Sequence, residues 1–207
     1  MRARLDALMV LDPRLAGIER AAGPLPWRVR PRGFAGLLQA ITGQQISNQA
    51  AAAIWRRVAM LPGALTPAGM LDLAPEALLG AGFSRPKLGH AHSLARAYVD
   101  GRLDDDALER MDDAAAIATL VAVPGLGPWT AEVYLLFALQ RVDVFPAGDI
   151  AVAGAAADLL GLAARPSPVV LRGLAEAWRP HRALAARLLW HHWRYLTGRP
   201  SMDDIVV

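Results

Sequence analysis

Residues 120–160 read LVAVPGLGPWTAEVYLLFALQRVDVFPAGDIAVAGAAADLL and place a turn rich in glycine and proline between two helical patterns. The Ala-rich segment before the turn, Asp112 to Val121, predicts a helix with Asp112 or Asp113 as its N-cap. Pro128 suits the first position of the second helix, because its missing N–H costs nothing there. An apolar stripe at helical spacing marks that helix: Trp129, Val133, Leu136 and Phe137. The stretch therefore predicts helix, glycine-rich hairpin, amphipathic helix, extended link, one carboxylate and a further helix.

Two features of this stretch are candidates for a functional site: a turn that can bind a phosphate and a single carboxylate. Gly125 and Gly127 permit a sharp turn and leave their N–H groups uncovered at a helix N-terminus, which favours a bound phosphate. The alternative is an ordinary tight turn between packed helices. Asp149 follows Pro-Ala-Gly and precedes an apolar helix, so it is a candidate carboxylate at a helix N-terminus. The alternative for Asp149 is an N-cap without any catalytic role.

The composition indicates a helical protein. The 207 residues (22.1 kDa) suffice for one domain with a core, and 54% of them are hydrophobic with few β-branched runs, which predicts an all-α fold. A net charge of +3 favours polyanionic partners only mildly. The absence of cysteine excludes disulfides and a cysteine-ligated iron–sulfur cluster. No apolar run approaches ~20 residues and no signal-peptide pattern is present, so we expect no membrane segment and a cytoplasmic location.

The rest of the chain predicts a single domain over residues 1–207, with an N-terminal segment at 1–33 and a flexible tail at 201–207. Between a short apolar helix, Phe34 to Thr42, and a helix capped by Ser47 lies a polar loop with Gln44 and Gln45. A solvated turn is the simplest interpretation of that loop. Lys87, near the start of another helix, either touches a phosphate or is solvated. The segment from Trp178 to Trp193 is predicted to begin the last long helix.

Three motifs resemble those of a known family. The hairpin with its helix, followed by VFPAGD, resembles the helix-hairpin-helix-GPD superfamily of DNA glycosylases, and its branch of 3-methyladenine DNA glycosylase II, or alkylpurine DNA glycosylase, is the most similar. ITGQQIS, Ile41 to Ser47, and WRPHR, beginning at Trp178, match further family segments. The resemblance implies a two-lobed helical fold with the active-site cleft between the lobes. It covers about Phe34 to Gly198 and is strongest from Leu120 to Asp149.

The resemblance also implies roles for individual residues. Asp149 corresponds to the catalytic carboxylate, and the loop with Gln45 enters the minor groove, where Gln45 fills the gap left by the flipped nucleotide. The implied DNA-binding residues are Gln44, Gln45, Gly125, Gly127 and Thr130. Three aromatic residues line the implied base pocket: Trp129, Tyr134 and Trp190. Main-chain carbonyls of Val121, Val123 and Leu126 correspond to a structural site for Na⁺ or K⁺, and no cofactor is implied for catalysis. Val133 stands where the family usually has an aromatic residue, so the pocket wall is expected to differ.

The chemistry predicted from the resemblance is monofunctional. In bifunctional relatives the hairpin reads P-G-x-G-x-K and its lysine forms a Schiff base, whereas Trp129 occupies that position here and Lys87 lies far away in the sequence. One carboxylate suffices for an alkylated purine, because the cationic base departs as a neutral molecule. We therefore expect hydrolysis of the N-glycosidic bond and an abasic product.

The functional hypothesis is base excision repair of alkylated purines on double-stranded DNA with a damaged base, by a monomer, in the cytoplasm of a bacterium on its nucleoid. Two alternatives remain open. One is a glycosylase for another lesion, such as hypoxanthine or an oxidised base. The other is a non-catalytic module that only grips DNA, although such a module would need neither Asp149 nor the Gln44-Gln45 loop.

Overall fold

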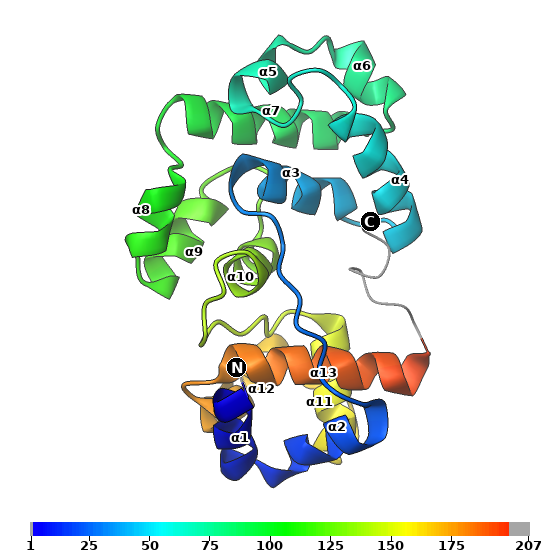
Figure 1. Ribbon diagram of the computed structural model, residues 1–207, viewed down its shortest axis with the longest axis vertical. Helices are drawn as coiled ribbons and strands as arrows, with labels where there is room; N and C mark the ends of the chain where they lie inside the picture. Colours follow the sequence, from blue (N-terminus) through cyan, green and yellow to red (C-terminus); the bar gives the residue numbers. More distant parts are fainter. Residues whose placement is uncertain (1, 199–207) are drawn as a thin grey trace. The chain divides into compact units, whose positions relative to one another are not determined.

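The computed structural model describes residues 2–198, and in this part of the chain every regular element is a helix (Figure 1). The described residues form two compact units: unit 1 comprises residues 2–28 and 140–198, and unit 2 comprises residues 29–139. The predicted all-α fold is confirmed. The tail at 201–207, predicted to be flexible, lies outside the described residues, and the single-domain assignment stays a prediction.

Unit 2 carries the helices α3 to α10, and most of them begin where the sequence supplies a cap. The side chains of Ser47, Thr66, Ser84, Asp104 and Asp112 each accept a backbone N–H bond at a helix start. The helices are α3 (Gly33–Gly43), α4 (Asn48–Ala59), α5 (Pro67–Asp72), α6 (Pro75–Gly80), α7 (Arg85–Val99), α8 (Asp105–Arg110), α9 (Asp113–Val121) and α10 (Pro128–Phe137). Helix α7 packs against α3 and α5, and α10 packs against α9 and α3 (Figure 1).

Helix α10 corrects one detail of the sequence analysis. The sequence predicts one apolar stripe, but every residue from Thr130 to Phe137 is buried, including Glu132 at 4% exposure. A helix that is apolar all round is buried all round, and Ala131 and Leu135 fill the face opposite the predicted stripe. The helix that follows the hairpin is therefore a core element and not a surface helix.

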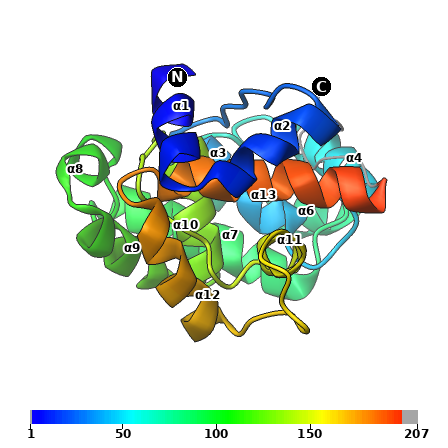
Figure 2. The ribbon, with the colours of Figure 1, turned by 90° about the horizontal axis from the view of Figure 1, so that it is seen from below.

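Unit 1 combines the first segment of the described chain with the last one. Its elements are α1 (Arg2–Leu11), η1 (Pro13–Leu15), α2 (Ala16–Ala22), α11 (Ile150–Leu159), α12 (Pro168–Leu174), η2 (Ala175–Trp178) and α13 (Arg182–Thr197). Helix α13 lies between α2 and α11 and contacts both (Figure 2). The last long helix thus begins at Arg182, because residues 175–178 form a separate 3₁₀ turn and Pro180 follows through a cis peptide bond.

A buried carboxylate connects the first and last segments of unit 1. Asp12, 4% exposed, accepts a 2.9 Å bond from the indole Nε1–H of Trp178 and two bonds from the Arg14 guanidinium. Burial by itself raises the pKa of Asp12, but the bonds from Arg14 and Trp178 outweigh burial and hold the pKa below its ordinary value. Asp12 is therefore a structural residue.

Within residues 2–198 no helix is long and apolar enough to cross a membrane.

Candidate active site

The hairpin between α9 and α10 is a tight turn, and the start of α10 has no side-chain cap. The Leu126 N–H donates to the Val123 carbonyl at 3.0 Å, and Gly125 has a φ of +99°, a conformation that side chains other than glycine rarely adopt. Gly127, the N-cap of α10, supplies no side-chain capping bond, and a Cβ at this position would point into open space. The first turn of α10 thus presents backbone N–H groups in a place that a phosphate can approach.

His90 supports the hairpin from α7, a role that the sequence analysis missed. A Cβ added to Gly125 would lie closer than 3.0 Å to three atoms of His90, so the imidazole packs directly against the hairpin backbone. In the sequence, His90 and His92 are two residues apart on a predicted helix, so their side chains diverge and make a poor metal pair. Residues 2–198 contain no group of three or more His, Cys, Asp or Glu side chains placed to hold a metal ion.

The Gln44-Gln45 loop touches the hairpin through Gln44. The Gln44 amide Nε2 donates to the Gly125 carbonyl at 2.9 Å and to the Thr130 hydroxyl at 3.3 Å. Thr130 is only 4% exposed, so its hydroxyl braces the loop inside unit 2. Gln45 is exposed and has a φ of +57°, which is uncommon for a residue other than glycine. The structure therefore separates the two glutamines: Gln44 joins two loops and Gln45 projects outward.

The carbonyls of Val121, Val123 and Leu126, predicted to bind a monovalent cation, lie at the end of α9 and in the hairpin. The Val123 carbonyl accepts the Leu126 N–H, which leaves one of its two lone pairs. No backbone bond to the Val121 or Leu126 carbonyl occurs among the described residues. Neutral carbonyl oxygens are hard ligands that suit Na⁺ or K⁺, so this donor set fits such an ion.

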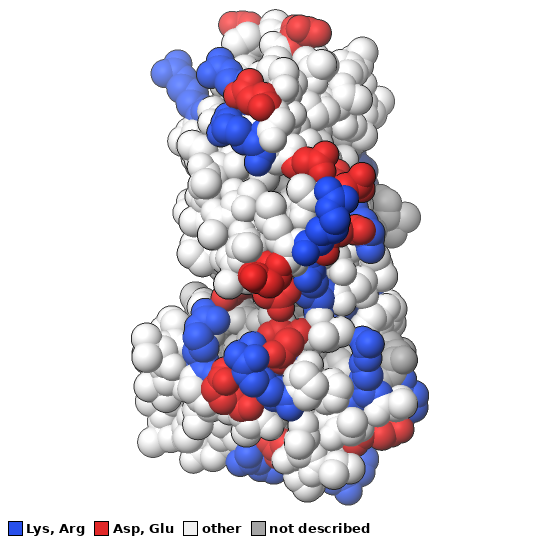
Figure 3. Space-filling model, turned by 90° about the vertical axis from the view of Figure 1, so that its left-hand side faces the viewer, with Lys and Arg blue, Asp and Glu red and all other residues white. Residues whose placement is uncertain are grey.

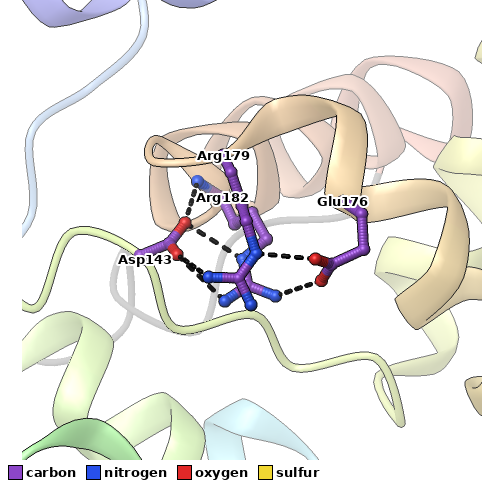
Figure 4. Close-up of polar contacts among 4 residues, drawn as sticks. All are labelled: Asp143, Glu176, Arg179 and Arg182. Carbon is purple, nitrogen blue, oxygen red and sulfur yellow. Dashed lines mark hydrogen bonds and ion pairs between the residues drawn. The ribbon is translucent and has the colours of Figure 1, made fainter.

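The link from α10 to Asp149 is fastened to the start of α13 by an ion network (Figure 4). The Asp143 carboxylate accepts bonds from Arg182 Nε at 3.0 Å, Arg182 Nη2 at 3.0 Å and Arg179 Nη1 at 2.8 Å. Both arginines also donate to Glu176. The neighbouring Val142 carbonyl accepts the Ala183 N–H at 3.1 Å. Backbone and side-chain bonds together fix the first half of the link.

Asp149 lies at the end of this link, as the N-cap of α11. Its Oδ1 accepts the N–H groups of Ala151 at 2.8 Å and Val152 at 2.9 Å, and its own N–H donates to the Pro146 carbonyl at 3.0 Å. The residue is 9% exposed, between the exposed Gly148 and Ile150. The carboxylate is thus held rigidly by backbone groups at the surface of an apolar helix, which suits a group that must meet a developing positive charge.

The three predicted pocket aromatics belong to different elements. Trp129 on α10 and Trp190 on α13 are half-buried, whereas Tyr134 on α10 is 4% exposed. The Tyr134 hydroxyl accepts the Gly33 N–H at 2.8 Å, and burial raises its pKa to about 12, so the phenol is neutral at ordinary pH. Val133, which stands where the family usually has an aromatic residue, is also buried. Trp129 and Tyr134 belong to unit 2, and Trp190 belongs to unit 1.

Charges on the molecular surface are mixed in sign. On the face shown in Figure 3, Lys and Arg side chains alternate with Asp and Glu side chains and form no continuous basic stripe. This mixture agrees with the small net charge of +3. This face therefore offers no single-sign patch that would attract a polyanion.

Comparison with known protein families identifies the family of this chain. A model described as HhH-GPD superfamily base excision DNA repair protein matches residues 38–180, a range that includes the Gln44-Gln45 loop, the hairpin and Asp149. The chain therefore belongs to the HhH-GPD superfamily of base excision DNA repair proteins.

Three similar proteins each cover most of this chain. The alkylbase DNA glycosidase-like protein of Schizosaccharomyces pombe is 26% identical over 193 residues, which are 88% of this chain and 89% of the relative. A DNA-3-methyladenine glycosidase structure from Bacillus halodurans superposes with a TM-score of 0.83 at 30% identity and covers 98% of this chain and 95% of that one. The S. pombe 3-methyladenine DNA glycosylase in complex with abasic DNA has a TM-score of 0.82 at 27% identity, with 97% and 100% of the two chains covered.

Proposed function

We propose that the protein is a monofunctional DNA glycosylase that hydrolyses the N-glycosidic bond of alkylated purines, of the 3-methyladenine and 7-methylguanine type, and leaves an abasic site. The observation that carries the proposal is Asp149, a carboxylate 9% exposed and fixed by two backbone N–H groups, which follows the hairpin in the order of the family. The names of the relatives, which refer to alkylated bases and 3-methyladenine, support this substrate class.

In the proposed reaction the damaged nucleotide is flipped out of the duplex before the C1′–N bond breaks. The bonding electrons leave with the base, and positive charge develops on the deoxyribose. The Asp149 carboxylate stabilises that charge and orients a water molecule, whose oxygen bonds to C1′ while its proton is released. An alkylated purine carries a positive charge beforehand and leaves as a neutral base, so no acid is needed to protonate it.

The other candidate residues have supporting roles in this proposal. Backbone N–H groups of Gly125 and Gly127, with Thr130 at the same helix start, hold a DNA phosphate, and Gln45 occupies the gap left by the flipped base. Trp129, Tyr134 and Trp190 are each proposed as an aromatic contact of the cationic base; Trp129 and Trp190 are half-buried, whereas Tyr134 is 4% exposed. A Na⁺ or K⁺ ion at the carbonyls of Val121, Val123 and Leu126 would supply positive charge beside the DNA backbone. It has no part in bond cleavage.

The proposed absence of lyase activity rests on the two residues relevant to amine chemistry. Trp129 stands at the hairpin position where bifunctional relatives have a lysine. Lys87, the only lysine in the chain, donates from Nζ to the Thr42 carbonyl at 2.6 Å. A Lys87 side chain directed at the end of α3 is not placed to attack a sugar carbon, so no Schiff base is expected at this residue. The protein is further proposed to act as a monomer on double-stranded DNA in a bacterial cytoplasm.

The test is release of free base from DNA treated with dimethyl sulfate, measured by chromatography, with wild type and Asp149→Asn in parallel. We expect wild type alone to release methylpurines. Strand breaks in the product should appear only after alkali, because a monofunctional enzyme leaves the abasic site intact. Breaks without alkali would contradict the monofunctional assignment.

The same assay distinguishes the other hypotheses. Duplexes with hypoxanthine or 8-oxoguanine replace the methylated DNA, and release from these alone would indicate a different lesion class. Salt-sensitive DNA binding without release from any duplex would indicate a module that only grips DNA.

A further inference from the structure

One face of α7 supports both loops that are proposed to contact DNA. Lys87 and His90 are three residues apart and therefore neighbours on the helix surface. The Lys87 ammonium bonds to the Thr42 carbonyl at 2.6 Å, and the His90 ring packs against Gly125 of the hairpin. Thr42 belongs to the last turn of α3, immediately before the Gln44-Gln45 loop. All of these contacts lie within unit 2.

The loop after Thr42 is held in a conformation that it would not adopt alone. Gln45 has a φ of +57°, and such a left-handed residue persists only where its surroundings fix it. Two side-chain contacts do so: Lys87 holds the carbonyl before the loop, and Gln44 joins the loop to the Gly125 carbonyl. The exposed side chain of Gln45 is thereby kept pointing away from the core of unit 2.

The position of Lys87 is itself unfavourable for a charged group. Burial lowers the pKa of the Lys87 ammonium, and no carboxylate lies within ion-pair distance in the described part of the chain. The C-terminal end of α3 compensates, because its carbonyl groups carry partial negative charge. A lysine that bonds a helix end at 2.6 Å is neither freely solvated nor free to reach a phosphate.

We propose that Lys87 is a positioning residue, which fixes the end of α3 so that Gln45 is presented to the gap in a DNA strand. This inference rests on the proposed function, in which DNA with a flipped or missing base offers such a gap. Lys87 itself touches no DNA. Its loss should weaken binding to DNA with a gap and leave binding to intact DNA unchanged, because the hairpin contacts remain.

The experiment measures the affinity of the full chain for two duplexes of one sequence, one intact and one with an abasic site. We expect Lys87→Met to weaken abasic binding by about tenfold, the size of one lost charge-assisted hydrogen bond, with the affinity for intact DNA and its salt dependence unchanged. Lys87→Arg should restore most of the preference, because its guanidinium also donates to a carbonyl. Arg85→Met is the matched control: it removes an exposed positive charge from the same helix and should not alter the preference.

Chemical modification provides the same comparison if Lys87→Met does not fold. Lys87 is the only lysine, so amine-selective acetylation of the folded protein changes Lys87 and the N-terminal amine alone. Acetylated Lys87→Arg controls for the N-terminus. Acetylated wild type should lose the abasic preference, and the acetylated variant should keep it.

Three results would overturn the inference. An unchanged preference in both Lys87→Met and the acetylated protein would show that Lys87 does not position the loop. A parallel loss of both affinities, with a weaker salt dependence, would show that Lys87 contacts a phosphate. A wild-type chain without any preference for abasic DNA would contradict the proposed function as well, whereas the first two results leave it intact.

Discussion

Helices α10 and α11 each have ten residues and each follows a segment rich in proline and glycine, but their first turns differ in charge. Gly127 leads into α10 without a side-chain capping bond, whereas Asp149 places a carboxylate on the first N–H groups of α11. An open helix start attracts an anion from outside, and a capped start already holds its own. In the proposed function the same local structure therefore serves two ends: one helix start binds a DNA phosphate, and the other offers a negative charge to the sugar.

The segments before these helices are also stabilised differently. The hairpin is braced by a hydrogen bond from the Gln44 amide and by packing of the His90 ring. The link to Asp149 is fastened by charged groups, with Asp143 bound to two arginines (Figure 4). The loop proposed to bind a phosphate thus has no carboxylate among these contacts, and the segment that carries Asp149 is anchored several residues before that carboxylate.

The largest effect is expected for Asp149→Asn. Asparagine caps helices as well as aspartate does, so the melting temperature and the affinity for DNA should be nearly unchanged. The rate of methylpurine release should fall by about 10²–10³-fold, the usual loss when one preorganised electrostatic group is removed. Single-turnover assays on alkylated duplex DNA measure this rate. Retained activity would mean that Asp149 is only a cap.

A smaller effect is expected for Gly125→Ala. The added methyl group meets His90, and the φ of +99° is strained for alanine, so the free energy of unfolding should fall by about 1–3 kcal/mol and DNA binding should weaken. Gly127→Ala is the matched control, because its Cβ enters open space at an ordinary φ of −87°. Denaturant titration of both variants checks the difference. Equal stability would show that the hairpin tolerates a side chain at Gly125.

Gly127→Asp would convert the open helix start into a copy of the capped one. We expect the fold to be retained, since aspartate is a favourable N-cap, and the affinity for intact duplex DNA to fall by about tenfold as the carboxylate takes the place of the phosphate. Gly127→Asn, which caps without a negative charge, separates capping from repulsion. Binding measured at several salt concentrations tests both variants. If neither weakens binding, this helix start does not hold a phosphate.

The smallest effect is expected for Asp143→Asn. The Asp143 side chain is 17% exposed and that of its partner Arg182 is 12% exposed, so loss of the charge should lower the free energy of unfolding by about 1 kcal/mol. Asp100→Asn is the control: it removes an ion pair whose side chains are 55% and 54% exposed, and should have no measurable effect. Thermal unfolding of the two variants gives the comparison. Similar melting temperatures would show that the network does not stabilise the link.

The parts of the fold that the sequence could predict depend on local signals. Ser47 and Asp149 were identified as helix caps from their own neighbourhoods, and both accept the expected backbone bonds. Pro128 likewise starts α10 as predicted. Such signals need only the few residues around them, because caps and proline act within one helical turn.

The remaining features depend on contacts between distant residues. The bond from Lys87 to Thr42 spans 45 positions and the bond from Gln44 to Gly125 spans 81, and no local pattern encodes either. The burial of both faces of α10 was missed for a related reason: the apolar stripe was counted, but the equally apolar Leu135 on the other face was not. His90 was missed because only the space left by Gly125 reveals it.

The division of the chain has a consequence for how the protein is made. Residues 29–139 of unit 2 are contiguous, so the ribosome completes them before any of the second segment of unit 1 emerges. During that time α1 and α2 lack α13, against which both pack, and Asp12 lacks Trp178, which follows 166 positions later. Apolar residues such as Leu8 and Ile18, which are buried in the finished protein, lack their final packing partners during this time. The newly made N-terminal segment therefore keeps apolar surface exposed until α13 has been synthesised.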